Sequence, residues 1–435
     1  MPAEDVDFDR FEIEQVDQVV ERARHWIMLA GTVPRMTTRS FPEGFRWGTA
    51  TAAHQVEGGN WNNDWWEWEH KPGSGCVEPS GDACEQYTRY PQDLELLAGL
   101  GFNSYRFSIE WSRIEPEDGE FSKAELDHYK RMCAACLENG LDATVTLHHF
   151  TTPRWVAKMG GWAEPATADL FARFADRVAA HMGDVATRWC TFNEPNMVAT
   201  GGYLAGQFPP GIRGERALRR KVNDVFVDAH RKTVEVVKSH QSDLPAGLTV
   251  AMQQMWPVGD TPERLEAARE RAARILDGLE DVFLHASETD DYIGVQTYSR
   301  MRVGPEGSLG NEEGVETTIM GYEFWPESLE ATIRRAWDVT NHTPIIVTEN
   351  GIAATDDTRR VEYVRRALAG VLACIDDGID VGGYTYWSLL DNFEWANGYG
   401  PTFGLIGVDR TTQERTVKPS ARWLGAIARA NAIDI

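Results

Sequence analysis

The feature that most constrains the fold is a regular alternation of short apolar runs with longer amphipathic stretches. Eight runs have the length of β-strands, at residues 45–49, 104–109, 143–149, 187–193, 247–253, 291–298, 344–349 and 380–388. Helical patterns follow most of them, at residues 124–139, 167–182, 219–239, 263–286, 326–338 and 359–376. No Gly/Ser-rich linker interrupts the series. We therefore predict one α/β domain in which eight parallel strands close into a (β/α)8 TIM barrel, with the active site at the C-terminal ends of the strands.

The alternative α/β arrangement is an open, doubly wound sheet. A dinucleotide-binding sheet of that kind would need a Gly-x-Gly-x-x-Gly turn after its first strand, and the chain has none there. We assign residues 41–435 to the barrel. Residues 1–40 form an N-terminal extension in which Phe11, Val16, Val20 and Ile27 recur at roughly the spacing of one amphipathic helix.

The charge of the chain limits its partners. Asp and Glu total 67 against 43 Lys and Arg, a formal net charge of -24, which repels nucleic acids and anionic membranes. No apolar run reaches the roughly 18 residues needed to span a bilayer, and the first residues carry acids where a secretory signal would carry bases. We expect a cytoplasmic protein with no nucleic-acid or membrane partner.

Of the six cysteines, only Cys133 and Cys136 have the spacing of metal ligands. They fall within a predicted helix with no second Cys or His pair nearby, so a tetrahedral zinc site would lack ligands. We interpret all six as free thiols and expect neither a metal nor a cofactor.

Polar and aromatic residues gather near the C-terminal ends of the predicted strands, which share one mouth in a barrel. Glu194 and Glu349 each end an apolar run, and each has an Asn neighbour, Asn193 and Asn350. The other residues expected at the mouth are His54, Gln55, Glu57, Arg106, His148, His149, Gln296, Tyr298, Trp387, Glu394 and Trp395.

Two carboxylates across one mouth suit the cleavage of a glycosidic bond. One protonates the leaving oxygen, and the other acts as nucleophile or base on the opposite face of the sugar. The ordinary alternative for either residue alone is a helix-capping or salt-bridged surface Glu.

Several motifs go further, because together they resemble glycoside hydrolase family 1, the β-glucosidase family. Phe45 to Gly59 resembles its N-terminal signature, Thr191 to Pro195 its acid/base motif and Thr348 to Gly351 its nucleophile motif. Further matches are Tyr105 to Ile114, Trp387 to Trp395 and Phe403 to Ile406, so the resemblance covers residues 41 to 430.

The resemblance implies a retaining, exo-acting β-glucosidase that cleaves small β-glucosides and short cello-oligosaccharides by double displacement. Glu349 would be the nucleophile, supported by Arg106 and Tyr298, and Glu194 the general acid and then base, with the two carboxyl groups about 5 to 5.5 Å apart. The residues implied to bind the substrate are Gln55, His149, Asn193, Gln296, Trp387, Glu394, Trp395 and Phe403.

Three positions depart from the family pattern. Phe150 replaces a Trp, Gln296 stands where Asn is common, and Thr402 stands where an Arg often precedes Phe403. These changes affect substrate preference and remove no catalytic group.

Other functions within the fold stay as alternatives. A 6-phospho-β-glycosidase is disfavoured, because no Lys or Arg lies between Trp387 and Phe403 to bind a phosphate. A β-galactosidase or β-fucosidase, a transglycosylating enzyme, and a catalytically silent carbohydrate-binding barrel remain open.

Overall fold

The computed structural model describes residues 37–435 and divides the chain into two compact units. The larger unit is residues 41–431. In the smaller unit, β1 (Thr38–Ser40) pairs antiparallel with β15 (Ala432–Asp434). The amphipathic helix expected within residues 1–40 falls on residues 1–36, outside the described part.

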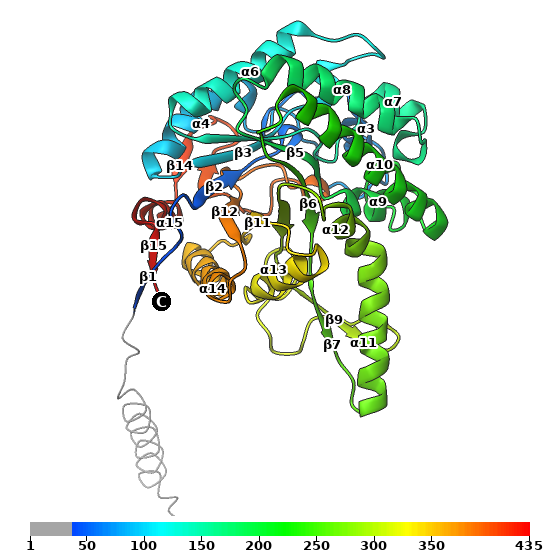
Figure 1. Ribbon diagram of the computed structural model, residues 1–435, viewed down its shortest axis with the longest axis vertical. Helices are drawn as coiled ribbons and strands as arrows, with labels where there is room; N and C mark the ends of the chain where they lie inside the picture. Colours follow the sequence, from blue (N-terminus) through cyan, green and yellow to red (C-terminus); the bar gives the residue numbers. More distant parts are fainter. Residues whose placement is uncertain (1–36) are drawn as a thin grey trace, which may run out of the picture. The chain divides into compact units, whose positions relative to one another are not determined.

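The larger unit is built on a closed barrel of eight parallel strands (Figure 1). The order of the strands around the barrel follows their order in the chain. They are β2 (Arg46–Ala50), β3 (Ser104–Ser108), β4 (Asp142–Thr146), β5 (Arg188–Asn193), β6 (Ala246–Ala251), β8 (Ile293–Gln296), β11 (Ile345–Asn350) and β12 (Val381–Trp387). Each corresponds to one predicted run, so the predicted TIM barrel is confirmed.

Helices on the outside cover the barrel. Those predicted from periodicity are α6 (Lys123–Glu138), α8 (Thr167–Met182), α10 (Arg216–His240), α11 (Pro262–Leu276), α12 (Val282–Ala286), α13 (Ser328–Val339) and α14 (Asp357–Asp376). The pattern at 263–286 is one stretch in which a π-helical turn, η2 (Asp277–Asp281), joins α11 to α12. The helices α4 (Gln86–Leu100) and α15 (Pro419–Ala430) were not predicted.

Short elements occupy the loops. They are α2 (Ala53–Val56), α3 (Asp64–Glu69), α5 (Trp111–Ile114), α7 (Arg154–Lys158), η1 (Gly161–Ala163), α9 (Pro195–Tyr203) and η3 (Trp395–Asn397). A small sheet joins β7 (Gln254–Pro257), β9 (Arg300–Gly304) and β10 (Gly307–Ser308), and a hairpin joins β13 (Ile406–Val408) to β14 (Arg415–Val417).

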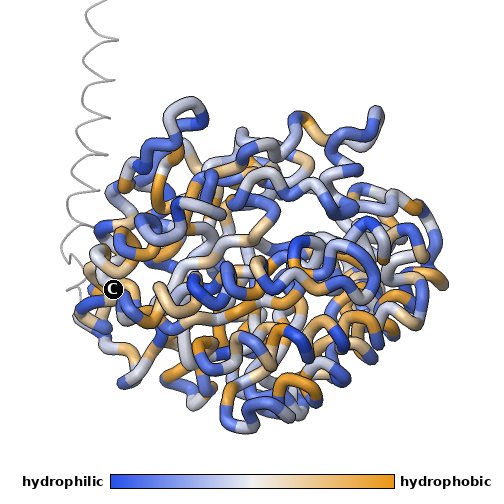
Figure 2. The backbone as a smooth tube through the Cα atoms, turned by 90° about the horizontal axis from the view of Figure 1, so that it is seen from above, coloured by the Kyte–Doolittle hydropathy of each residue, from blue (hydrophilic) through white to orange (hydrophobic). Residues whose placement is uncertain are grey.

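The hydrophobic core forms because each barrel strand is covered on both faces. All residues of β5 and β11 are buried, as expected of parallel strands between a packed interior and a layer of helices. Figure 2 shows hydrophobic and hydrophilic stretches alternating along the outer helices, the pattern of helices with one buried face. This packing leaves the strand ends and loops to carry the polar side chains.

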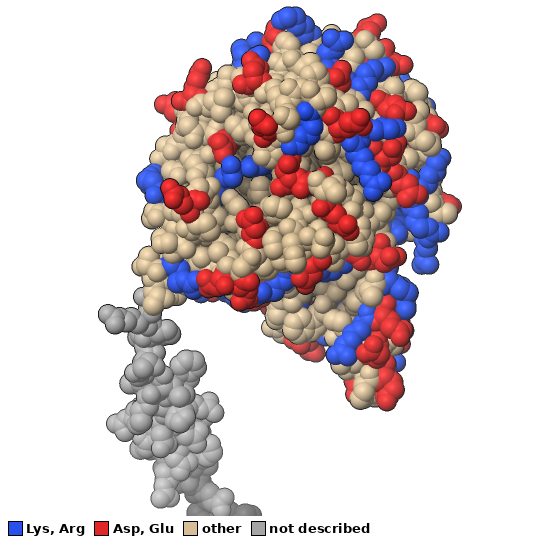
Figure 3. All heavy atoms as spheres, viewed as in Figure 1, with Lys and Arg blue, Asp and Glu red and all other residues tan. Residues whose placement is uncertain are grey.

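The charged groups lie mainly outside this core. Figure 3 shows Lys and Arg interspersed with Asp and Glu over the face in view. Among residues 37–435, no helix is both long and apolar enough to cross a membrane, and no group of three or more His, Cys, Asp or Glu could hold a metal ion.

Candidate active site

A cavity of about 560 Å³ lies at the C-terminal ends of the barrel strands. Residues from the ends of β5, β8, β11 and β12, and from the loops that follow, form its wall. Of the predicted site residues, the cavity is lined by His149, Asn193, Glu194, Gln296, Tyr298, Glu349, Trp387, Glu394, Trp395 and Phe403. Arg106 and Gln55 are not among the lining residues but contact them through hydrogen bonds.

Glu349, near the end of β11, is held by two donors. Arg106 Nη1 lies 2.7 Å from Oε1, and the Tyr298 hydroxyl lies 2.7 Å from Oε2. The carboxyl group is buried, with 4% of the residue exposed. Burial raises the pKa of Glu349, and the charge of Arg106 and the hydroxyl of Tyr298 work against that rise. These contacts therefore favour the ionised carboxylate.

Glu194 has a different environment. It follows β5 with φ of 47°, and Pro195 begins α9 directly after it, which is a favourable place for Pro. Among the described residues, no side chain donates a hydrogen bond to its carboxyl group or pairs with it as a cation. Burial, and then the negative charge of Glu349, raise the pKa of Glu194 well above its ordinary value. Glu194 therefore favours the protonated form.

Asn193 is fixed beside these carboxyl groups. Its Oδ1 accepts from Arg106 Nη2 at 2.6 Å and from Gln296 Nε2 at 3.0 Å. Gln296 is held in turn, because the Thr249 hydroxyl donates to its Oε1 at 2.9 Å. The Gln that replaces the common Asn thus uses its amide to orient Asn193.

His149 completes this network. Asn193 Nδ2 lies 3.1 Å from His149 Nε2, so with Asn193 oriented as above Nε2 is the acceptor and Nδ1 carries the proton. Burial, aided by the charge of Arg106, lowers the pKa of His149 well below its ordinary value, so the ring is neutral. Nδ1 is buried without a hydrogen-bond partner. The arrangement presents a neutral N–H donor.

Aromatic rings surround His149. Its ring centroid lies 5.9 Å from Trp387 and 6.1 Å from Trp395, with interplanar angles of 25° and 17°. Phe150 and Trp395 both have positive φ, 69° and 52°, which is unfavourable for large side chains. Like Glu194, they are cavity residues held in strained backbone conformations.

Glu394 is a third acidic group on the wall. Gln55 Nε2 donates to Phe393 O at 2.8 Å and lies 3.4 Å from Glu394 Oε2. Burial and the charge of Glu349 raise the pKa of Glu394 to about 8. Gln55 Oε1 is buried with no hydrogen-bond partner.

Three residues expected at the mouth lie elsewhere. His54 contacts Glu69 at 3.2 Å, and Glu57 accepts from Arg113 and Tyr129, both at 2.9 Å. His148 is buried among the rings of Trp162, Phe171, Phe192 and Phe226. Burial lowers its pKa to about 3, so it is a neutral core residue.

Other lining residues carried no sequence signal. They include Met197, Gln207, Phe208, Arg213, Gln253 and Met320, and they come from the loops after β5, β6 and β8. These loops have no repeated pattern, and only the barrel geometry identifies them as cavity walls.

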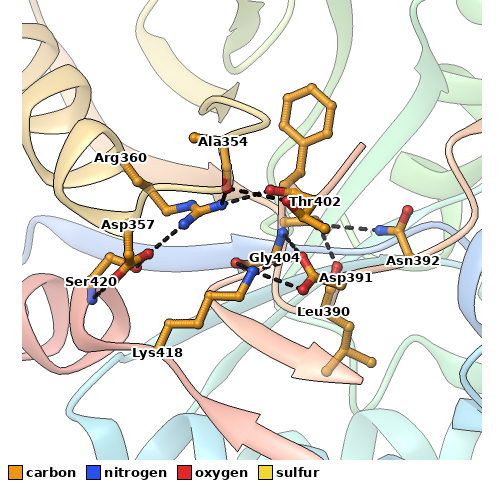
Figure 4. Close-up of polar contacts among 12 residues, drawn as sticks. Ala354, Asp357, Arg360, Leu390, Asp391, Asn392, Thr402, Gly404, Lys418 and Ser420 are labelled. Carbon is orange, nitrogen blue, oxygen red and sulfur yellow. Dashed lines mark hydrogen bonds and ion pairs between the residues drawn. The ribbon is translucent and has the colours of Figure 1, made fainter. Parts of the chain in front are cut away.

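The loop after β12 is braced from beneath, as Figure 4 shows. Lys418 Nζ lies 2.8 Å from both Asp391 Oδ1 and the carbonyl oxygen of Gly404. Arg360 pairs with Asp357 and donates to the carbonyl oxygen of Thr402 at 2.6 Å. Both cations are therefore engaged in holding the loop.

Known proteins resemble this chain over most of its length. The model of glycosyl hydrolase family 1 matches residues 37–306 and 286–433. A solved β-glycosidase, BGL167, is 47% identical, has a TM-score of 0.83, and aligns over 90% of this chain and 98% of its own.

Two curated relatives differ in their named activity. β-Glucosidase A of Thermotoga maritima is 32% identical over 92% of this chain and all of its own length. A 6-phospho-β-galactosidase of Clostridium acetobutylicum is 30% identical over 89% of this chain and 97% of its own. The sequence motifs and these matches, which cover most of each chain, agree. The chain therefore belongs to glycosyl hydrolase family 1 and is a β-glycosidase.

Proposed function

We propose that this enzyme is a retaining, exo-acting β-glucosidase of unphosphorylated β-glucosides and short cello-oligosaccharides. The observation that carries the proposal is the asymmetry of the two carboxyl groups on one cavity. Arg106 and Tyr298 contact Glu349, whereas Glu194 has no such donor and faces the charge of Glu349. One carboxyl group is suited to attack as a nucleophile and the other to give a proton.

In the first step, a carboxylate oxygen of Glu349 attacks the anomeric carbon of the glucosyl unit. The bond from that carbon to the leaving oxygen breaks, and the proton of Glu194 passes to the leaving oxygen. Once Glu349 is esterified, its negative charge is lost. The pKa of Glu194 then falls, because that charge is one of the causes of its rise.

In the second step, ionised Glu194 takes a proton from water. The hydroxide oxygen bonds to the anomeric carbon, the ester to Glu349 breaks, and glucose leaves with its original anomeric configuration. A sugar hydroxyl in place of water gives transglycosylation with the same two residues.

The sugar would be held by the fixed polar groups of the wall. Asn193 has its oxygen occupied by Arg106 and Gln296, which leaves an N–H for the 2-hydroxyl. His149 Nδ1, Gln55 Oε1 and the carboxyl group of Glu394 serve other hydroxyls. Trp387 supplies an apolar surface for the ring.

An unphosphorylated sugar fits this site better than a 6-phosphosugar. Glu394 places a carboxyl group on the cavity wall, and the two cations beneath the loop after β12 are already paired with Asp391 and Asp357. A phosphate there would find no free cation from that loop. We therefore propose a different substrate from that named for the Clostridium relative.

A panel of aryl β-glycosides tests the proposal. We expect kcat/KM to be highest for the glucoside, compared with the galactoside, fucoside, xyloside and 6-phosphogalactoside. NMR of the first product should show β-glucose, and cellotetraose should release glucose and cellotriose first. An α-configured first product would rule out the double displacement, and a preference for the phosphorylated sugar would rule out the assigned substrate.

A further inference from the structure

Three segments leave the cavity wall and meet again outside it. Gln253, Ser299 and Tyr322 line the cavity. The residue after Gln253 begins β7, the residue after Ser299 begins β9, and the chain after Tyr322 leads to Trp325. Figure 1 shows β7 and β9 side by side with α11, in a projection that continues from β6. This projection is therefore the outward continuation of one side of the cavity.

The three segments build an aromatic cluster, which we call the Trp256 platform and which comprises Trp256, Arg300 and Trp325. The Arg300 guanidinium lies 3.5 Å from the ring centroid of Trp325 and 4.7 Å from that of Trp256. The two indole rings are 5.7 Å apart at 67°, an edge-to-face contact. Both kinds of contact are attractive for these groups.

Other contacts fix the platform in place. Arg300, which is 7% exposed, pairs with Glu323 and, at 2.7 Å, with Glu312. The indole N–H of Trp325 donates to Gln254 Oε1 at 3.0 Å, and Gln254 lies two residues before Trp256 on β7. Each member of the platform thus comes from a different segment and is held by that segment's neighbours.

Trp256 is nevertheless 40% exposed. Most large aromatic residues of this chain are buried in the core, and exposing an indole ring gives no folding advantage. A rigid, partly exposed indole on the outward continuation of a cavity wall loses little conformational entropy when an apolar surface stacks on it. The C–H faces of β-linked glucosyl rings are such a surface.

We propose that the Trp256 platform is a distal leaving-group subsite, which stacks a glucosyl unit of the departing oligosaccharide beyond the unit next to the cleaved bond. This inference rests on the proposed β-glucosidase function and extends it to a preference for longer chains. Charge does not oppose such a ligand, because the sugar is neutral and the carboxylates of Glu312 and Glu323 are paired with Arg300.

Chain-length kinetics test the platform. We would measure kcat/KM for cellobiose, cellotriose, cellotetraose and 4-nitrophenyl β-glucoside with the unaltered enzyme and with Trp256→Ala. The variant should lose roughly three- to tenfold on cellotetraose, mainly through KM, because one aromatic contact is removed. The aryl glucoside and cellobiose should change by less than about twofold, and Trp256→Phe should keep part of the advantage on cellotetraose.

Trp61→Ala is the matched control. Trp61 is also exposed, at 59%, and has Arg154 over its ring at 5.7 Å, but it lies between α2 and α3, outside the three segments that build the platform. It should leave every rate unchanged. The platform is wrong if Trp256→Ala keeps the full dependence on chain length, or if it lowers the rates of all four substrates equally.

The two proposals fail in different ways. If the unaltered enzyme cleaves the aryl glucoside, but Trp256→Ala does not change the dependence of kcat/KM on chain length, the proposed function stands and the subsite is wrong. An unaltered enzyme that cleaves no β-glucoside loses the function. In that case, calorimetric titration with cellotetraose compares the affinity of the unaltered protein with that of Trp256→Ala and tests the subsite alone. Equal affinities would overturn the subsite.

Discussion

Glu349 and Glu194 are the same residue type, each at the end of a parallel strand on one cavity, yet their surroundings are opposite. Glu349 receives two hydrogen bonds, from a guanidinium and a phenol. Glu194 receives none from the described side chains, and its backbone is strained by a positive φ. In the proposed mechanism, their neighbours, not their residue type, make Glu349 the nucleophile and Glu194 the acid. This difference between the two carboxyl groups can be tested by changing either of them or the groups that support them.

Removing Glu349 should have the largest effect. Glu349→Gly should abolish detectable turnover of 4-nitrophenyl β-glucoside, because no group remains to form the glycosyl-enzyme. Added azide should restore turnover by attacking from the vacated side, which gives the α-glucosyl azide. The product is identified by NMR. Glu43→Gly, in an exposed turn just before β2 and so at the opposite end of the barrel from the cavity, is the control that should keep full activity. Near-full activity of Glu349→Gly would contradict the assignment.

Removing Glu194 should have the next largest effect. Glu194→Ala should lower kcat/KM on cellobiose by about 10² to 10⁴, the usual contribution of a positioned proton donor. Aryl glucosides with acidic leaving groups should lose less in the first step. Azide should again raise the rate, but here by attacking the ester on Glu349, so the product is the β-glucosyl azide. An α-azide from this variant would mean that the two roles are reversed.

Removing the phenol that supports Glu349 should have an intermediate effect. Tyr298→Phe should lower kcat/KM about tenfold to a hundredfold, the range for a lost hydrogen bond to a charged group. Its hydroxyl lowers the pKa of Glu349, so its loss should raise that pKa. On the acidic limb of the pH–activity profile, activity requires ionised Glu349, so this limb should move to higher pH. The basic limb, which reports the loss of the proton on Glu194, should stay in place, and a profile with an unmoved acidic limb would count against the role of Tyr298.

The smallest effect on kcat/KM is expected from changing Gln296, which supports Asn193. Gln296→Leu removes the donor to Asn193 Oδ1, while Arg106 still holds that oxygen, and it also removes a side-chain contact that lowers the pKa of Glu349. We expect a loss of about two- to tenfold in kcat/KM for the glucoside, as for one neutral hydrogen bond. A 2-deoxyglucoside, which lacks the hydroxyl that Asn193 would bind, should lose less than the glucoside. Equal losses on both substrates would show that Gln296 does not act through Asn193.

The barrel could be predicted because its strands are buried on both faces and so appear as continuous apolar runs. After two of these runs, the chain goes on into strands outside the barrel. β7 follows the run at 247–253 and β9 follows the run at 291–298, and both strands belong to the separate small sheet. Helix α4 was missed; Pro91 lies inside it, although Leu94 and Leu97 are buried as in any packed helix.

The site was predictable only in part. Strand ends correctly placed Glu194, Glu349, Asn193 and His149 on one cavity. The same rule failed for His54 and Glu57, because their partners Glu69 and Arg113 come from other segments and turn them away from the cavity. Nor could the sequence show that Gln296 supports Asn193, since that depends on side-chain geometry. The expected cytoplasmic location stays a prediction.

Trapping the covalent intermediate tests the central claim most directly. A 2-deoxy-2-fluoro-β-glucoside with a good leaving group should label the enzyme once, because the fluorine slows the second step more than it slows the first. Digestion and mass spectrometry should place the fluoroglucosyl group on the peptide that contains Glu349. A label on Glu194, or unlabelled enzyme that still turns over the parent glucoside, would contradict the account.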